Sequence, residues 1–166
     1  MQLFNHHYLL LFEAQVKCTN LQSAAVTLRI LRDIRQRVAS WNVLNSWAIE
    51  LLVEKVLASC GKPLSPGDAL RRVFEAISSG ILFANGPGIM DPCEKDKRDV
   101  LSDLTGQQRE DITSSAQHAL RLIAFNQIYK ILGIERLPDA RTSSGFLNDR
   151  KRPRDPSDQD DGEVIG

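Results

Sequence analysis

The sequence lacks an excess of either charge and contains little cysteine. Its 21 Lys and Arg residues balance its 21 Asp and Glu residues, so no net charge draws the whole protein to nucleic acid or to an anionic membrane. Any nucleic-acid contact must therefore be local. The three cysteines, Cys18, Cys60 and Cys93, lie far apart and form no CxxC pair. This pattern favours a reduced intracellular protein, in which they pack as small hydrophobic residues, over a secreted one.

Long hydrophobic runs are also missing. The apolar run at residues 8–12 is too short to span a bilayer, and no cationic stretch precedes it as in a signal peptide. We therefore expect a soluble protein that is not secreted. With 166 residues, the chain is long enough to bury a core without disulfides or a bound metal.

Motifs that carry chemistry are absent as well. A nucleotidyltransferase needs a Gly-Ser turn for the phosphates and carboxylates that hold metal ions. This chain has no Gly-Ser dipeptide, and its only Asp-x-Asp spacing is formed by Asp158 and Asp160 near the C-terminus. Gly61 and Lys62 lack the rest of a P-loop, and the histidines lack partners at zinc-ligand spacing. Sequence order alone leaves a Ser-His-Asp or Cys-His arrangement open, but no nucleophile-elbow pattern supports one. We expect no catalytic residue, no metal site and no cofactor.

Four amphipathic segments predict a mainly α fold. Apolar residues recur at helical spacing over residues 20–38, 46–59, 65–80 and 105–132. The third segment begins with a serine followed by a proline. The fourth begins with a Thr-x-x-Gln capping box and is expected to run unbroken until Gly133 ends it. Residues 81–103 lose the periodicity and are rich in turn-forming residues, with room for short extended pieces.

The composition changes beyond Pro138, where Ser, Asn, Asp, Arg and Pro dominate. Hydrophobic residues are too sparse there to offset the cost of ordering, so we expect a disordered tail over residues 139–166. The tail carries the densest positive cluster of the chain, formed by Arg150, Lys151, Arg152 and Arg154. Four basic side chains within five residues favour a nuclear-import signal over a merely solvating run. Contact of this cluster with RNA phosphates would be weak, because residues 155–163 are acidic.

Three arginines of the first predicted helix are a further candidate for RNA contact. Arg29, Arg32 and Arg35 recur three residues apart and either form a ridge that faces phosphates or belong to a solvated face. Trp41 and Trp47 flank the turn before the second helix. We interpret them as core anchors rather than base-stacking platforms, because aromatic residues are few and no sheet is predicted to carry them.

Several short runs resemble one known family. These are LQS at residues 21–23, RILRD at 29–33, GDALRRV at 67–73, GIMDPCE at 88–94, QQREDI at 107–112 and AQHALR at 116–121. Together they resemble the second half of the DZF domain, which occurs in zinc finger RNA-binding proteins and in the interleukin enhancer-binding factors. The likeness covers residues 21–138 in unbroken order. The amino-acid sequence at residues 65–68 and 112–115 is most similar to the zinc finger RNA-binding branch of the family.

The resemblance implies a fold and a way of acting. The complete DZF domain is similar to template-independent nucleotidyltransferases, with an α/β lobe followed by a helical lobe, and serves for pairing rather than catalysis. The chain is then an atypical segment at residues 1–18, the helical half of the domain at 19–138 and the tail at 139–166. Because the α/β lobe is missing, we expect a fragment of the family domain, a splice variant or an incomplete gene model. The alternative is the helical lobe of an active nucleotidyltransferase.

The family also implies partners and a compartment. We expect a non-enzymatic protein that forms a heterodimer with another DZF protein of the interleukin enhancer-binding factor type. Such complexes assemble on double-stranded or structured RNA in the nucleus, and in the cytoplasm as a second location. The zinc fingers and double-stranded-RNA-binding domains of the family lie outside this sequence, so RNA is reached through the complex or through those missing domains.

One face of the long predicted helix is the expected pairing surface. Arg121, Phe125 and Tyr129 are four residues apart, so an unbroken helix would place them on one side. Arginine and aromatic residues are the types that anchor protein interfaces. In the alternative interpretation, these residues complete the core.

Overall fold

In a computed structural model of the chain, residues 21–94, 96 and 98–138 are described. The elements are α2 (Leu21–Arg37), a short 3-10 helix η1 (Ala39–Trp41), α3 (Ser46–Ala58), α4 (Pro66–Ser78), α5 (Gly106–Ala124) and α6 (Ile128–Leu132). These residues form no strand, only a single antiparallel bridge between Met90 and Asp99. The mainly α prediction is confirmed. The predictions for residues 1–18, for the tail at 139–166 and for the basic cluster within it lie outside the described residues.

The helices begin where capping side chains were expected. Ser65 accepts a hydrogen bond from the Asp68 amide, and Pro66 occupies the first position of α4. At α5, the Thr105 hydroxyl accepts from the Gln108 amide while the Gln108 side chain accepts from the Thr105 amide, which completes the predicted capping box. The sequence-predicted starts of these two helices are therefore confirmed.

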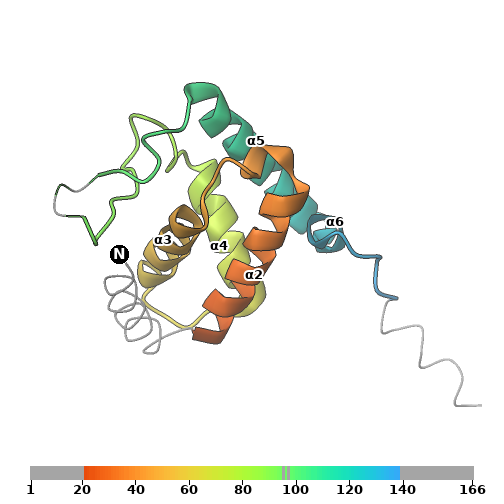
Figure 1. Cartoon of the computed structure of the whole chain (residues 1–166). Coiled ribbons are helices and arrows are strands. Elements are labelled where there is room, and N and C mark those ends of the chain that lie inside the picture. Colours follow the sequence, from red (N-terminus) through yellow and green to blue (C-terminus); the bar gives the residue numbers. More distant parts are fainter. Residues whose placement is uncertain (1–20, 95, 97, 139–166) are drawn as a thin grey trace, which may run out of the picture. The chain divides into compact units, whose positions relative to one another are not determined.

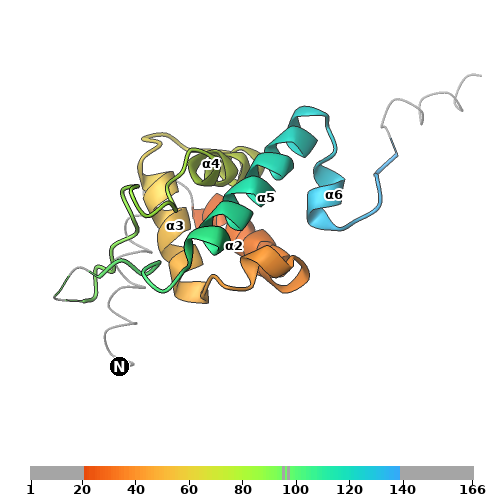
Figure 2. The same ribbon diagram turned by 90° about the horizontal axis from the view of Figure 1, so that it is seen from above.

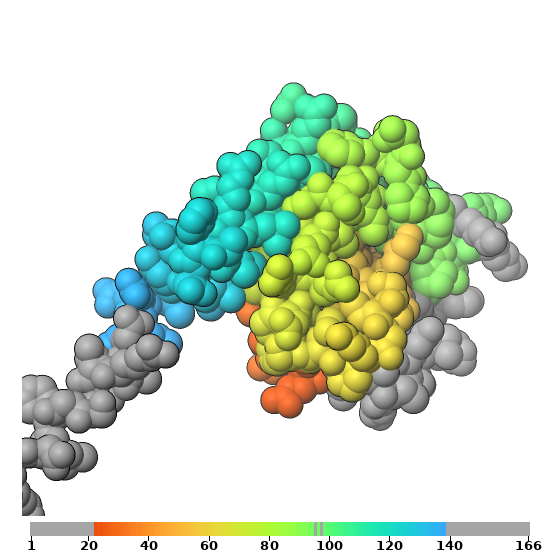
Figure 3. Space-filling model, turned by 180° about the vertical axis from the view of Figure 1, so that it is seen from behind, coloured from red at the N-terminus to blue at the C-terminus, as the bar shows by residue number. Residues whose placement is uncertain are grey.

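The helices pack around one core. Helices α2, α3 and α4 contact each other, and α5 packs along α4 (Figure 1; Figure 2). Figure 3 shows α4 flanked by α3 on one side and by α5 on the other. Trp41 and Phe74, each 1% exposed, meet edge to face with ring centroids 6.0 Å apart. Aromatic pairs favour this geometry. The core role predicted for Trp41 is confirmed.

The connection between α4 and α5 is irregular, as its turn-rich composition predicted, but it is held firmly. Arg109 of α5 is only 6% exposed and donates hydrogen bonds to the carbonyl oxygens of Leu82, Leu101 and Leu104. Within the connection, the Asp99 carboxylate accepts from the amides of Ile89 and Leu101, at 3.0 Å each. These side-chain bonds add to the two backbone bonds that flank the Met90–Asp99 bridge, Asp91 N–H to the Arg98 carbonyl and Val100 N–H to the Ile89 carbonyl.

The expected unbroken helix over residues 105–132 is wrong. Helix α5 ends at Ala124, and Asn126 adopts a left-handed φ of 55°. The Asn126 amide donates to the Ile123 carbonyl, and the Gln127 amide to the Leu122 carbonyl. This pair of bonds is the Schellman pattern, in which a left-handed residue closes a helix. Asparagine tolerates that conformation better than most side chains, so the chain turns here and restarts as α6.

Arg37 fastens the short helix α6 to α2. Its Nη2 donates to the Ile131 carbonyl oxygen at 2.9 Å, and its Nε donates to Asp33 at 2.6 Å. Gly133 ends α6 with a φ of 65°, as predicted. A Cβ at Gly133 would lie 2.9 Å from Nη1 of Arg37. A larger residue at this position would therefore have to adopt a left-handed backbone and displace the end of the Arg37 side chain.

We predict that Gly133→Ala loosens this contact and lowers the free energy of unfolding by about 1–2 kcal/mol, the cost of a left-handed non-glycine residue. Urea denaturation followed by circular dichroism measures the loss. Gly67→Ala is the matched control, because only the Ser65 hydroxyl, at 4.0 Å, faces a Cβ there. The control is expected to be neutral or slightly stabilising. Equal stability of the two variants would contradict the role assigned to Gly133.

Candidate interaction surface

The break after α5 rearranges the three residues predicted to bind a partner. Arg121 is exposed in the last turn of α5, and Phe125 caps that helix with 74% of its surface exposed. The Phe125 amide bonds to the Arg121 carbonyl, so these two residues remain one turn apart. Tyr129 belongs to α6 and is half-buried. The expected common face therefore does not include Tyr129, because the helix does not continue through it.

Apolar side chains are exposed beside this break. Among the described residues up to Arg136, the two most exposed large hydrophobic residues are Phe125, at 74%, and Ile134, at 50%. They lie just before and just after α6. Isolated exposed apolar residues are common on protein surfaces, but aromatic side chains this open are also the type that anchors protein interfaces.

A groove with a volume of about 260 Å³ lies where α2, η1, α4, α5 and α6 meet. Apolar side chains form most of its lining: Ile34, Val38, Trp41, Phe74, Ala119, Leu122 and Ile131. Its polar lining residues are Arg37, Ser115, His118 and Lys130. Trp41 donates from its indole nitrogen to the Ser115 hydroxyl at 2.9 Å. Residues of the core thus form the floor of the groove. Its polar lining consists of three basic side chains and one hydroxyl group.

Sequence reasoning did not identify this groove. Its basic residues Arg37, His118 and Lys130 come from three different helices. His118 is one of the histidines without partners at zinc-ligand spacing, and the structure shows it exposed. No local spacing links these three positions. Only the packing of α6 against α2 brings them to one groove.

Two of the three arginines proposed to contact RNA interact with α3. Arg32 forms an ion pair with Glu50, at 2.6 Å, and Arg35 donates to the Ser46 hydroxyl at 3.1 Å. Arg29 is exposed. The arginine row therefore helps to join α2 to α3. Contact with RNA through this row stays a prediction.

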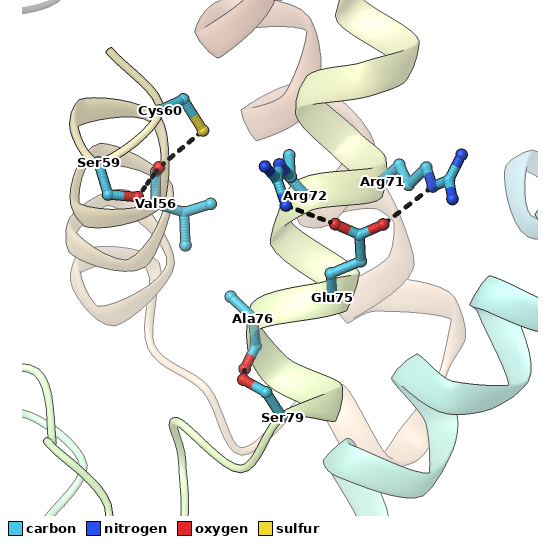
Figure 4. A network of polar contacts seen from close by, with 8 residues as sticks. All are labelled: Val56, Ser59, Cys60, Arg71, Arg72, Glu75, Ala76 and Ser79. Carbon is cyan, nitrogen blue, oxygen red and sulfur yellow. Dashed lines mark hydrogen bonds and ion pairs between the residues drawn. The ribbon is translucent and has the colours of Figure 1, made fainter.

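A second hollow, between α3 and α4, is lined by polar side chains that bond to other groups of the protein. Figure 4 shows Glu75 between Arg71 and Arg72, with N–O distances of 2.9 and 3.0 Å. Ser59 and Cys60 both donate to the Val56 carbonyl oxygen of their own helix. These groups are engaged with their own helices and leave no convergent set aimed at a ligand.

The connection between α4 and α5 is docked onto α3. Lys55 donates to the Gly88 carbonyl oxygen at 2.7 Å, and the Trp47 indole donates to Asp91 at 2.8 Å. Trp47 is only partly buried, so it packs at the edge of the core. Burial raises the pKa of the Cys93 thiol, and the neighbouring Asp91 carboxylate raises it further. The Cys93 thiol is therefore poorly suited to act as a nucleophile.

Over residues 21–94, 96 and 98–138, no group of three or more His, Cys, Asp or Glu side chains is placed to hold a metal ion. None of the helices described is both long and apolar enough to cross a bilayer.

Comparison with known protein families gives a match that covers most of these elements. Residues 23–146 match the family model described as the DZF C-terminal domain. The match includes η1 and helices α3 to α6 in full and all but the first two residues of α2.

Proposed function

Because the chain belongs to the DZF family through this C-terminal domain, we propose that it is a non-catalytic module that pairs with another DZF protein. The expected partner is a protein of the interleukin enhancer-binding factor type. We further propose that the pair acts in the nucleus in complexes on double-stranded or structured RNA. The nuclear part of this proposal draws on Arg150, Lys151, Arg152 and Arg154 as an import signal.

The exposure of Phe125 is the observation that carries the proposed pairing. A ring that leaves 74% of its surface in water gains hydrophobic free energy when a partner covers it. Arg121, one turn earlier, supplies the planar cation that interfaces often place beside aromatic residues. We therefore centre the pairing surface on Arg121 and Phe125, with Ile134 as the neighbouring apolar residue and Tyr129 as a half-buried support.

We predict that Phe125→Asp weakens capture of a purified interleukin enhancer-binding factor DZF domain by about 30-fold, the effect of losing one anchor of roughly 2 kcal/mol. Arg121→Glu is expected to weaken capture as well. Isothermal titration calorimetry gives the dissociation constants. Met90→Asp is the matched control, because Met90 is an exposed apolar residue, at 46%, on the α4–α5 connection.

The outcomes distinguish an error in the assigned pairing surface from an error in the proposed pairing itself. If the control and both test variants bind equally well, the pairing surface lies elsewhere. If the unaltered chain binds no DZF domain at all, the proposed pairing is wrong.

A further inference from the structure

The groove between α2, α5 and α6 is smaller than a small-molecule pocket. Its volume of about 260 Å³ lies below the roughly 300–1,000 Å³ typical of sites for drug-sized ligands. That space suits one or two side chains of another protein. The buried residues Ile34, Trp41 and Ile131 contribute to its wall, so an inserted apolar side chain would meet carbon atoms of the core.

The charge of the lining is one-sided. Arg37, His118 and Lys130 line the groove, and no carboxylate does. Arg37 is held in place by Asp33 and by the Ile131 carbonyl oxygen, so its charge is partly compensated but fixed in position. Lys130 is exposed and forms no ion pair within the described part of the chain. This arrangement favours carboxylates next to the inserted side chain.

Nucleic acid fits the groove less well than protein does. Base stacking needs an open aromatic face, but Trp41 and Phe74 are each only 1% exposed. A phosphate backbone needs a track of cations and polar donors, whereas seven of the eleven lining residues are apolar. The combination of an apolar floor and basic neighbours matches an amphipathic acidic peptide.

We propose that this groove binds a segment of a partner protein that carries a large apolar side chain flanked by carboxylates. The apolar side chain enters between α2 and α5, and the carboxylates face Lys130, His118 and Arg37. This binding does not depend on the DZF pairing proposed above, which is centred on Phe125.

Titration of the full chain, labelled with nitrogen-15, tests this site with synthetic peptides. The probe is a 12-residue peptide with a central phenylalanine flanked on each side by glutamates. The sequence contains two tryptophans, so two indole N–H signals report on different places. Trp41 lines the groove, while Trp47 donates to Asp91 on the α4–α5 connection. The Trp41 signal is expected to shift saturably, and the Trp47 signal to stay in place.

Two altered peptides and two chain variants sharpen the test. Replacing the glutamates by glutamine, or the phenylalanine by alanine, is expected to weaken binding by about tenfold each. Lys130→Glu is expected to have an effect of about the same size. Arg29→Glu makes the same charge change on an exposed residue of α2 that does not line the groove, and it should bind like the unaltered chain.

Three results would overturn the inference. They are no saturable shift of Trp41, equal affinity for the glutamate and glutamine peptides, and a Trp41 shift produced by duplex RNA but not by the acidic peptide. None of these bears on capture of a DZF domain through Phe125. Loss of DZF capture, in turn, leaves the peptide titration unaffected.

Discussion

Arg109→Met is expected to lower the free energy of unfolding by about 3–5 kcal/mol, the scale seen when a buried charged group loses its partners or leaves them unpaired. The Arg109 guanidinium is 6% exposed and donates to the carbonyl oxygens of Leu82, Leu101 and Leu104. Methionine fills similar space but offers no donor, so all three carbonyl groups lose the Arg109 donor, and only that of Leu101 keeps another, the Leu104 amide at 3.0 Å. Each unsatisfied buried acceptor costs roughly 1–3 kcal/mol, less where water can enter.

Urea denaturation monitored by circular dichroism measures this loss, and hydrogen exchange locates it. The amides of Ile89 and Leu101, which donate to Asp99, are expected to exchange faster in the variant. Arg109→Lys should fall between the variant and the unaltered chain, because one ammonium cannot reach all three carbonyls in the geometry of a guanidinium.

Arg98→Met is the matched control for Arg109→Met. Arg98 lies on the same connection and pairs with Asp103 at 3.0 Å, but its side chain is 59% exposed. An exposed ion pair contributes at most about 1 kcal/mol. If Arg109→Met costs no more than Arg98→Met, the connection is not held by Arg109.

The sequence could predict the helices but not this arginine. Periodic apolar residues and the caps at Ser65 and Thr105 placed both ends of α4 and the start of α5 within a residue or two. Arg109 lies in the first turns of α5 between polar residues, a pattern that is typical of a solvated face. Its burial depends on carbonyls 27 and 8 residues away in the chain, and no local pattern reports such contacts.

The end of α5 shows why the pairing surface was only partly predictable. Apolar residues continue through residues 122–132 at near-helical spacing, so periodicity alone extends the helix. The signal against it was a single asparagine, Asn126, at a position where a left-handed residue can close a helix. That break moved Tyr129 onto α6 and left Phe125 at a helix end. The groove followed from the same break, because α6 had to turn back onto Arg37 to form it.

Trp41 is buried in the core and also lines the groove. Its replacement is the second substitution from which we expect a large loss of stability. Trp41→Ala should lower the free energy of unfolding by about 3–5 kcal/mol, the cost of removing a large buried aromatic side chain. The loss combines the contact with Phe74, at 6.0 Å between ring centroids, and the hydrogen bond to Ser115. Urea denaturation of the purified chain measures it.

Trp41→Phe separates these two contributions. It keeps an aromatic ring near Phe74 but removes the donor to the Ser115 hydroxyl, so a loss of about 1–2 kcal/mol is expected, from the missing hydrogen bond and the smaller ring. Trp47→Ala is the control, since Trp47 is only partly buried at the edge of the core. A smaller loss for Trp41→Ala than for Trp47→Ala would mean that the junction of η1, α4 and α5 contributes little to stability. The buried residues that line the groove, Trp41 and Phe74, would then not be needed for folding.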